Sequence, residues 1–119
     1  MNVNVLAYLG DAVYELYVRE FLINKGIVKT NLLMQEAINY VSAKSQVKIL
    51  NELILHNILT KEEQDIVKRG RNNSKDTHPK NTDIITYKQA TGLEALIGYL
   101  YLNDKQRLDQ IMVSIFEVI

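Results

Sequence analysis

Apolar residues recur at helical spacing along most of this chain, and that periodicity constrains its fold more than any other feature. The stripe Val47, Leu50, Leu53 and Ile54 is one example, because it places apolar side chains on one face of a helix. Sustained alternation of apolar and polar residues bounded by hairpin turns, which would indicate strands, is absent from the sequence. We therefore predict an all-α fold.

Local signals divide the chain into six predicted helices. Gly26 can adopt the left-handed conformation past a helix end, and Thr60 followed by Glu63 is a capping box. The polar residues 70–83, which include Pro79, predict a loop. The expected helices span residues 3–25, a segment capped by Thr30 or Asn31 and ending near Val41, residues 43–56 behind a Ser42 cap, a segment from the Thr60 box to Arg69 or Gly70, residues 86–103, and a last segment capped by Asp104.

Length and composition narrow the class of protein. The 119 residues suit one domain and are too few for two, so we expect a single domain over residues 1–119. The absence of cysteine excludes a disulfide scaffold, a Cys-based zinc site and cysteine catalysis. Lys and Arg total 14 and Asp and Glu total 14, so a nucleic-acid partner must be met by a local patch. Neither a secretory signal nor a membrane span is evident, and we expect a cytoplasmic protein.

Two carboxylates stand alone on segments that otherwise avoid charge. Asp11 is the only charged residue within residues 1–14, and Glu94 is the only one within residues 89–103. A carboxylate near a helix-packed interior is costly unless it meets a cation, a hydrogen-bond donor or a metal. Two such acids favour a shared cation. The alternative is that each accepts hydrogen bonds from Tyr, Thr or a basic side chain at a helix junction.

Glycines lie next to both acids. Gly10 and Gly92 fall inside predicted helices, where each costs about 1 kcal/mol relative to alanine. Close approach of two helix backbones would offset that cost and would bring Asp11 and Glu94 together. Oxygen ligands without histidine or cysteine suit a hard cation, Mg²⁺ or Mn²⁺, that retains several waters and can activate one of them beside a phosphoryl group.

Basic residues gather around the predicted loop and indicate a local phosphate-binding surface. Gly70 would let the backbone turn there and expose its N–H groups. Neither a base-reading helix nor an aromatic stacking platform is evident, so we expect contacts to phosphate and sugar, as in shape-based recognition of duplex RNA. A solvated charged loop is the alternative. The expected RNA-binding residues are Lys68, Arg69, Arg71, Asn72, Lys75 and Lys80.

Several motifs resemble a known family. Residues 6–13, Leu-Ala-Tyr-Leu-Gly-Asp-Ala-Val, resemble the signature helix of ribonuclease III domains. Residues 93–102, Leu-Glu-Ala-Leu-Ile-Gly-Tyr-Leu-Tyr-Leu, resemble their second acidic helix. Residues 40–44, 69–72 and 79–83 fit, in order, the Mini-ribonuclease III branch, which has the catalytic domain without a double-stranded-RNA-binding domain.

The resemblance implies an all-α homodimer that cleaves double-stranded RNA with a divalent cation, Mg²⁺ with Mn²⁺ as a substitute, leaving a 5′-phosphate and a 3′-hydroxyl. By the match, Asp11 and Glu94 are its catalytic, metal-binding acids. The branch points to maturation of the large-subunit (23S) ribosomal RNA precursor, with a ribosomal protein as a candidate for presenting the RNA. Full-length ribonuclease III has further acids where this chain has Asn4, Ala7 and Thr91, and Mini-ribonuclease III enzymes also lack much of that set.

Three other functions compete with this one. A noncatalytic ribonuclease III-like domain would bind RNA or ribosomal proteins as an assembly factor, but the presence of Asp11 and Glu94 favours catalysis. An all-α metal phosphohydrolase acting on nucleotides usually has a His-Asp dipeptide, and neither His56 nor His78 precedes an aspartate. A helical protein-interaction module would leave the isolated acids and the basic residues unexplained.

The first predicted helix also suggests an interface. It is apolar on more faces than its own core can use, and excess apolar surface of that kind usually marks a contact with another chain. Tyr8 stands where the signature helix of the family contributes an aromatic side chain to the partner. A two-fold dimer would place two identical acid clusters across one duplex, so we expect an obligate homodimer.

Overall fold

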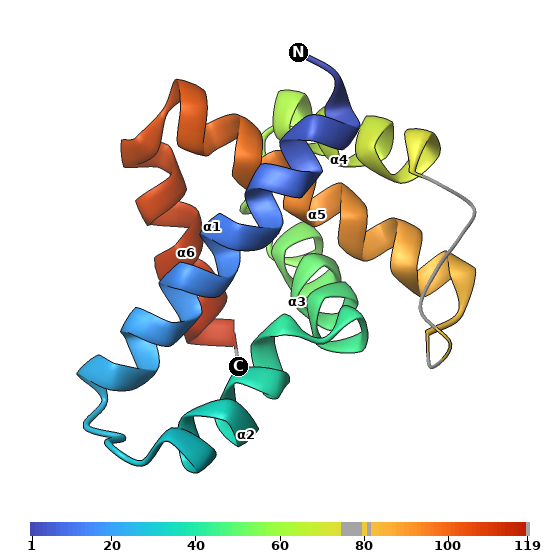
Figure 1. The fold of residues 1–119 in the computed structure, drawn as a ribbon. Helices are drawn as coiled ribbons and strands as arrows, with labels where there is room; N and C mark the ends of the chain where they lie inside the picture. The colour runs from blue at the N-terminus through green and yellow to red at the C-terminus, as the bar shows by residue number, and fades with distance from the viewer. Residues whose placement is uncertain (75–79, 81, 119) are drawn as a thin grey trace.

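The computed structural model describes residues 1–74, 80 and 82–118, and these residues form six helices without a strand. The predicted all-α fold is confirmed. Among the described residues, none of the helices is both long enough and apolar enough to cross a membrane. The helices are α1 (Val3–Asn24), α2 (Thr30–Val41), α3 (Ala43–Leu55), α4 (Lys61–Asn73), α5 (Ile84–Asn103) and α6 (Lys105–Val118) (Figure 1).

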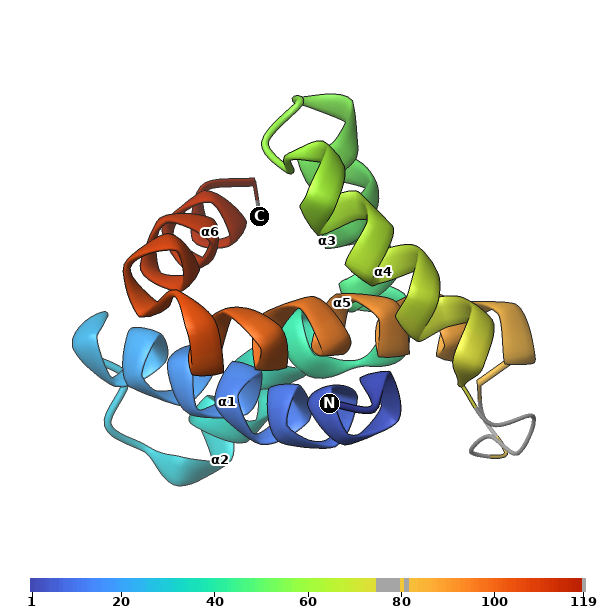
Figure 2. The ribbon, with the colours of Figure 1, turned by 90° about the horizontal axis from the view of Figure 1, so that it is seen from above.

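Helix α5 is the centre of the fold. It packs against α1, α3, α4 and α6. Seen from above, α1 runs along one side of α5, while α4 and α6 lie on the other side (Figure 2). A helix that is apolar all round is expected to be enclosed by its neighbours, and Leu93, Leu96 and Ile97 of α5 are fully buried. Glu94 belongs to the same helix and lies where α5 contacts its neighbours.

Most helix ends follow the local signals in the sequence. The Ser42 side chain caps α3, and the predicted capping box opens α4 with both of its hydrogen bonds. The predicted cap of α2 is wrong, because Thr30 and Asn31 already belong to the helix. Lys29 occupies the cap position and its side chain makes no capping hydrogen bond.

The structure also corrects the end of α4. The sequence predicted fraying near Arg69 or Gly70 followed by a loop, but the helix continues to Asn73. Gly70 is buried inside this helix, and a Cβ atom there would lie 2.8 Å from the Ala95 Cβ and 3.0 Å from the Gly92 Cα of α5. Gly70 therefore permits close packing of α4 on α5 rather than a turn.

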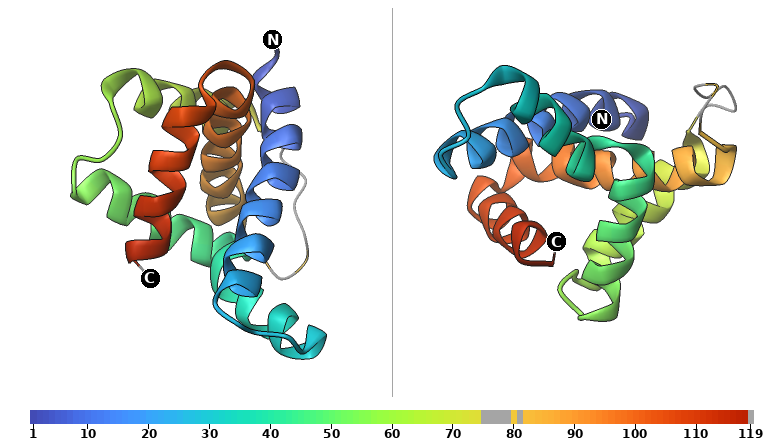
Figure 3. Two further views of the ribbon diagram at one scale, coloured as in Figure 1. Left: turned by 90° about the vertical axis from the view of Figure 1, so that its left-hand side faces the viewer. Right: turned by 90° about the horizontal axis from the view of Figure 1, so that it is seen from below.

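Helix α6 folds back beside α5 (Figure 3) and is tied to the start of α4 by Arg107. The Arg107 Nε and Nη2 atoms each donate to one carboxylate oxygen of Glu63 at 2.8 Å, and Nη2 also donates to the Ile58 carbonyl at 2.7 Å. The hydrogen bonds from Arg107 to Glu63 lower the pKa of this buried carboxyl. The ion pair between Arg107 and Glu63 therefore links α6 to α4.

Candidate active site

Two glycines allow α1 and α5 to touch through their backbones. A Cβ atom at Gly10 would overlap the Glu94 carbonyl, and one at Gly98 would overlap the Leu6 carbonyl. Only glycine permits so close a crossing, since any other residue would push the helices apart. The close approach expected at Gly10 is confirmed.

The second glycine named by the sequence has a different role. A Cβ atom at Gly92 would lie 2.6 Å from the Val67 carbonyl oxygen, so Gly92 serves the contact of α5 with α4. Gly98, which the sequence analysis did not single out, is the glycine of α5 that faces α1. A sequence shows that a helix contains a glycine, but it does not show which neighbouring helix that glycine faces.

The crossing brings the two isolated carboxylates to one pocket. Asp11 comes from α1 and is exposed, whereas Glu94 comes from α5 and is partly buried. The expectation that both acids lie near the interior therefore holds for Glu94 alone. The pocket has a volume of about 400 Å³ and is lined by Asn4, Val5, Ala7, Tyr8, Asp11, Ser74, Tyr87, Thr91 and Glu94.

Burial and the neighbouring acid make ionisation of Glu94 unfavourable. Burial raises the pKa of Glu94 to about 8, and both the charge of Asp11 and a hydrogen bond with it contribute to the rise. A hydrogen bond from Gln46 acts in the opposite direction. Two carboxylates in one pocket with such a pKa shift form an electrostatic setting that a bound cation would relieve.

Gln46 is the residue of this site that the sequence analysis missed. It lies in the first turns of α3, is 3% exposed, and its Nε2 atom donates to Glu94 Oε2 at 3.3 Å and to the Val41 carbonyl at 3.0 Å. Its Oε1 atom is buried and has no hydrogen-bond partner among the described residues. A glutamine on the same side of α3 as Ile49, Leu50 and Leu53 was the available signal.

The chemistry of the donors fits a hard divalent cation. Asn4, Ala7 and Thr91, where full-length ribonuclease III has acids, all line the pocket, and the Thr91 hydroxyl donates to the Tyr87 carbonyl at 2.9 Å. Within the described part of the chain, no group of three or more His, Cys, Asp or Glu side chains could hold a metal ion. Two carboxylates suit Mg²⁺ or Mn²⁺ that retains several waters, and they do not supply a zinc site.

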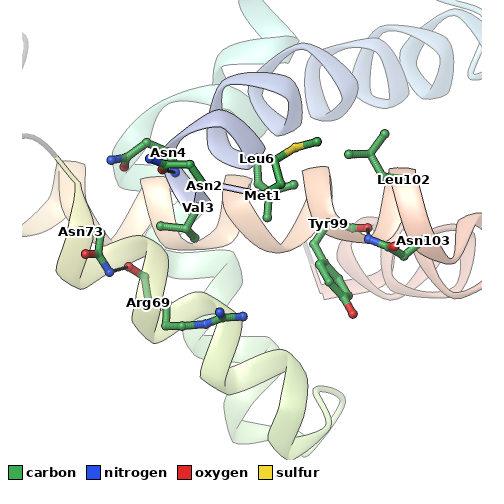
Figure 4. Close-up of a pocket in the computed structure, with 10 residues that line it drawn as sticks. All are labelled: Met1, Asn2, Val3, Asn4, Leu6, Arg69, Asn73, Tyr99, Leu102 and Asn103. Carbon is green, nitrogen blue, oxygen red and sulfur yellow. Dashed lines mark hydrogen bonds between the residues drawn. The ribbon is translucent and has the colours of Figure 1, made fainter.

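Part of the predicted RNA-binding set lines pockets on the side of α4 that borders α5. Lys68 and Arg69 line a pocket of about 940 Å³ together with Tyr99 and Asn103 of α5. Arg69 also lines the pocket drawn in Figure 4, which has a volume of about 670 Å³. Asn4 belongs both to that pocket and to the pocket of the two acids. The first turn of α1 therefore separates Arg69 from the acid pair.

The other predicted RNA-binding residues lie elsewhere. Arg71 and Asn72 line a separate pocket, so α4 presents its basic residues on more than one side. Lys80 is exposed, and Lys75 lies outside the described residues. The structure therefore places Arg71 and Asn72, which the sequence assigned to the loop, on helix α4 together with Lys68 and Arg69.

Known proteins share this fold and sequence. A model of the ribonuclease III domain matches residues 4–105, and the chain belongs to the ribonuclease III domain family, a class of endoribonucleases. A Mini-ribonuclease 3 from Brevibacillus brevis is 50% identical over 119 residues, which cover 99% of this chain and 87% of that protein. A Mini-ribonuclease 3 from Enterococcus faecalis is 44% identical over 113 residues, which cover 94% of this chain and 86% of that protein.

A solved structure is also similar to this chain. The crystal structure of a protein from Fusobacterium nucleatum superimposes with a TM-score of 0.83 at 35% identity, covering 97% of this chain and 92% of that one. The resemblance of the motifs to the Mini-ribonuclease III branch is confirmed by the curated relatives.

Proposed function

We propose that residues 1–119 form one catalytic domain that cleaves double-stranded RNA with a divalent cation, Mg²⁺ or Mn²⁺, held by Asp11 and Glu94. The observation that carries this proposal is the meeting of these two carboxylates in one pocket where α1 crosses α5. Membership of the ribonuclease III domain family supports the type of reaction. The substrate we propose is a duplex stem of the large-subunit (23S) ribosomal RNA precursor, with a ribosomal protein as a partner that presents it.

The two acids have different roles in this proposal because they differ in their exposure to solvent. A divalent cation bound there supplies a polarised water and neutralises charge at the scissile phosphate. Asp11 is exposed and so is accessible from solvent, while Glu94 offers its carboxyl from the partly buried side of the pocket. Because the pKa of Glu94 is about 8, a cation arriving at neutral pH must displace a proton from this carboxyl. We therefore expect metal binding to strengthen as the pH rises toward 8.

We propose that RNA is held through its phosphates by Lys68, Arg69, Arg71, Asn72, Lys75 and Lys80. The position of Ser74, directly after α4, in the lining of the acid pocket supports this, because it places the end of α4 beside the two carboxylates. The formal net charge is +0, so attraction for RNA must come from local groups of this kind. Replacing Arg69, Arg71 and Lys75 together by glutamine should weaken all duplexes about equally. The slope of log affinity against log salt concentration should become shallower by a little under one unit for each phosphate that the variant no longer neutralises.

A homodimer is the assembly we propose. Helix α1 carries large apolar side chains that are exposed in the single chain, with Val5 51%, Tyr8 83% and Leu16 61% exposed. These positions follow one another at helical spacing and so share a side of α1. Tyr8 also lines the acid pocket, so a partner packed on this side would lie next to the catalytic groups. Sedimentation equilibrium at micromolar protein should give a dimer, and a monomer that cuts both strands in one binding event would refute the arrangement.

The proposed activity is tested by incubating the protein with a perfect RNA duplex and Mg²⁺, with EDTA as the metal-free control. Asp11→Asn should lower cleavage by about a hundredfold or more while leaving duplex affinity unchanged, because it removes a charged ligand and preserves shape. Glu117→Gln, which removes an exposed charge from α6, is the matched control and should cleave like the parent chain. Cleavage by Asp11→Asn at the parent rate under saturating Mg²⁺ would remove this residue from the site.

A further inference from the structure

We infer that Gln46 is a positioning residue of the active site: its side-chain amide fixes the Glu94 carboxyl from α3 so that this acid is set to share a cation with Asp11. The inference rests on the proposed metal site and adds a third residue to it. Gln46 belongs to neither of the acidic motifs, and it reaches Glu94 across 48 positions of sequence.

The orientation of the Gln46 amide is determined by its two acceptors. The Nε2 group has two protons, and it donates one to Glu94 Oε2 at 3.3 Å and one to the Val41 carbonyl at 3.0 Å. Reversing the amide would place its oxygen against the Val41 carbonyl oxygen, which has no proton to donate. The donation to Val41 therefore favours the arrangement in which the nitrogen also faces Glu94.

The backbone around Gln46 is also fixed. Ser42 caps α3 by accepting a hydrogen bond from the Ser45 N–H, and the Gln46 N–H donates to the Ser42 carbonyl at 2.9 Å in the first turn of the helix. The second acceptor, Val41, is the last residue of α2. A donor held on the junction of two helices can restrain a carboxyl on a third helix more firmly than a donor on a loop would.

The unpartnered oxygen of Gln46 indicates that this side chain lowers the stability of the fold. Gln46 Oε1 is buried and has no hydrogen-bond partner among the described residues. A buried acceptor without a partner lowers stability, and native proteins keep few of them. An apolar residue of similar volume would fill the same space between α3 and α5 without that loss, so the amide adds only its two donations, to Val41 and to Glu94.

The role of Gln46 is a restraint on one oxygen of the carboxyl. The hydrogen bond to Glu94 Oε2 limits rotation of the Glu94 carboxyl. The other carboxylate oxygen, Glu94 Oε1, accepts no hydrogen bond from Gln46. Outer hydrogen bonds of this kind orient metal ligands, and their loss typically lowers metal affinity or activity by about tenfold to a hundredfold. A residue that only stabilised the end of α2 through Val41 would have no such effect.

The test uses Gln46→Met, which keeps a similar volume and removes both donors, in the full chain without RNA. Binding of Mn²⁺ is followed by the loss of the electron paramagnetic resonance signal of the free ion. We expect Mn²⁺ affinity to fall about tenfold, kcat for duplex cleavage to fall by a similar factor, and KM for the duplex to stay within about twofold. Leu50→Met, a matched substitution of a buried residue on α3, should leave all three at the parent values.

Stability measurements and a second variant keep the test decisive. If Gln46→Met does not fold, Gln46→Ala replaces it, because alanine is the best helix former and leaves room for water. Parent-like Mn²⁺ affinity and kcat in either folded variant would overturn the inference, even if stability had fallen. Loss of affinity in Leu50→Met as well would also overturn it, because the effect would then be general to α3.

A separate variant distinguishes this inference from the proposed function. If Asp11→Asn binds Mn²⁺ as tightly as the parent chain, the proposed metal site itself is wrong. If Asp11→Asn loses Mn²⁺ and Gln46→Met retains it, the site stands and the role of Gln46 does not.

Discussion

Replacing Glu94 by glutamine should stabilise the metal-free protein while abolishing cleavage. The pKa of Glu94 is about 8 in the folded chain against an ordinary value of 4.5, first because of burial and then because of Asp11. Between these two pH values the folded protein holds a proton on Glu94 that the unfolded chain has released. Stability therefore falls as the pH rises through that window, and glutamine, which does not ionise, removes the loss.

The size of the effect follows from the shift. At pH 7 the part of the pKa displacement that lies between 4.5 and 7 corresponds to about 3 kcal/mol of lost stability. The carboxyl is only partly buried, so screening by solvent reduces the expected gain of Glu94→Gln to about 2 kcal/mol. For a domain of this size that gain raises the melting temperature by about 8 °C.

Thermal unfolding followed by circular dichroism in EDTA, from pH 4 to pH 9 at one protein concentration, measures this gain. The difference between Glu94→Gln and the parent chain should be largest at pH 8 and above and should vanish below about pH 4.5, where Glu94 is protonated in both the folded and the unfolded chain. Glu117→Gln, which removes an exposed charge, should shift stability by less than about 0.5 kcal/mol. Adding Mg²⁺ should raise the melting temperature of the parent chain and not that of Glu94→Gln. A variant that is no more stable than the parent at pH 8 would refute the reasoning.

Three further substitutions test the packing. Gly10→Ala or Gly98→Ala should lower the free energy of unfolding by about 3 kcal/mol, because the added methyl group overlaps a backbone carbonyl of the opposing helix; urea denaturation measures it, and a loss below about 1 kcal/mol would contradict the crossing. Arg107→Met should cost about 2 to 3 kcal/mol at pH 7, since it leaves Glu63 buried without its partner. The pKa of Glu63 is lowered in the folded chain, so that loss should shrink as the pH falls below about 4, and an equal loss at pH 7 and pH 3 would contradict the ion pair as its cause.

The helices were predictable because their signals are local. Ser42 and the capping box at Thr60 lie within a few residues of the N–H groups that they satisfy, so a short window of sequence contains both partners. Gly70 misled the same reasoning, because a glycine inside a helix resembles a helix end until the opposing residue is known. That residue is Ala95 of α5, far along the sequence and adjacent only in the fold.

The candidate site divides in the same way. The isolation of Asp11 and Glu94 from other charges is visible in the sequence and led to the correct pairing of α1 with α5. A helical wheel shows on which side of a helix a residue lies, but it does not show how far the contact with a neighbouring helix extends. Asp11 is exposed and lies outside the contact between the helices. Gln46, on a third helix, lies close enough to donate a hydrogen bond to Glu94.

The crossing and the acid pair depend on each other through the same residues. Gly10 precedes Asp11 in the chain and contacts the backbone of Glu94, so the contact between the helices also sets the separation of the two acids. Where both acids are ionised, repulsion between them opposes that contact, and the buried side chains of α5 offset it. The backbone segments that carry the two acids therefore cannot move apart without unpacking the central helix. We therefore expect a cation that binds this pair to regain the stability lost there, because the rigid crossing already holds the two acids together.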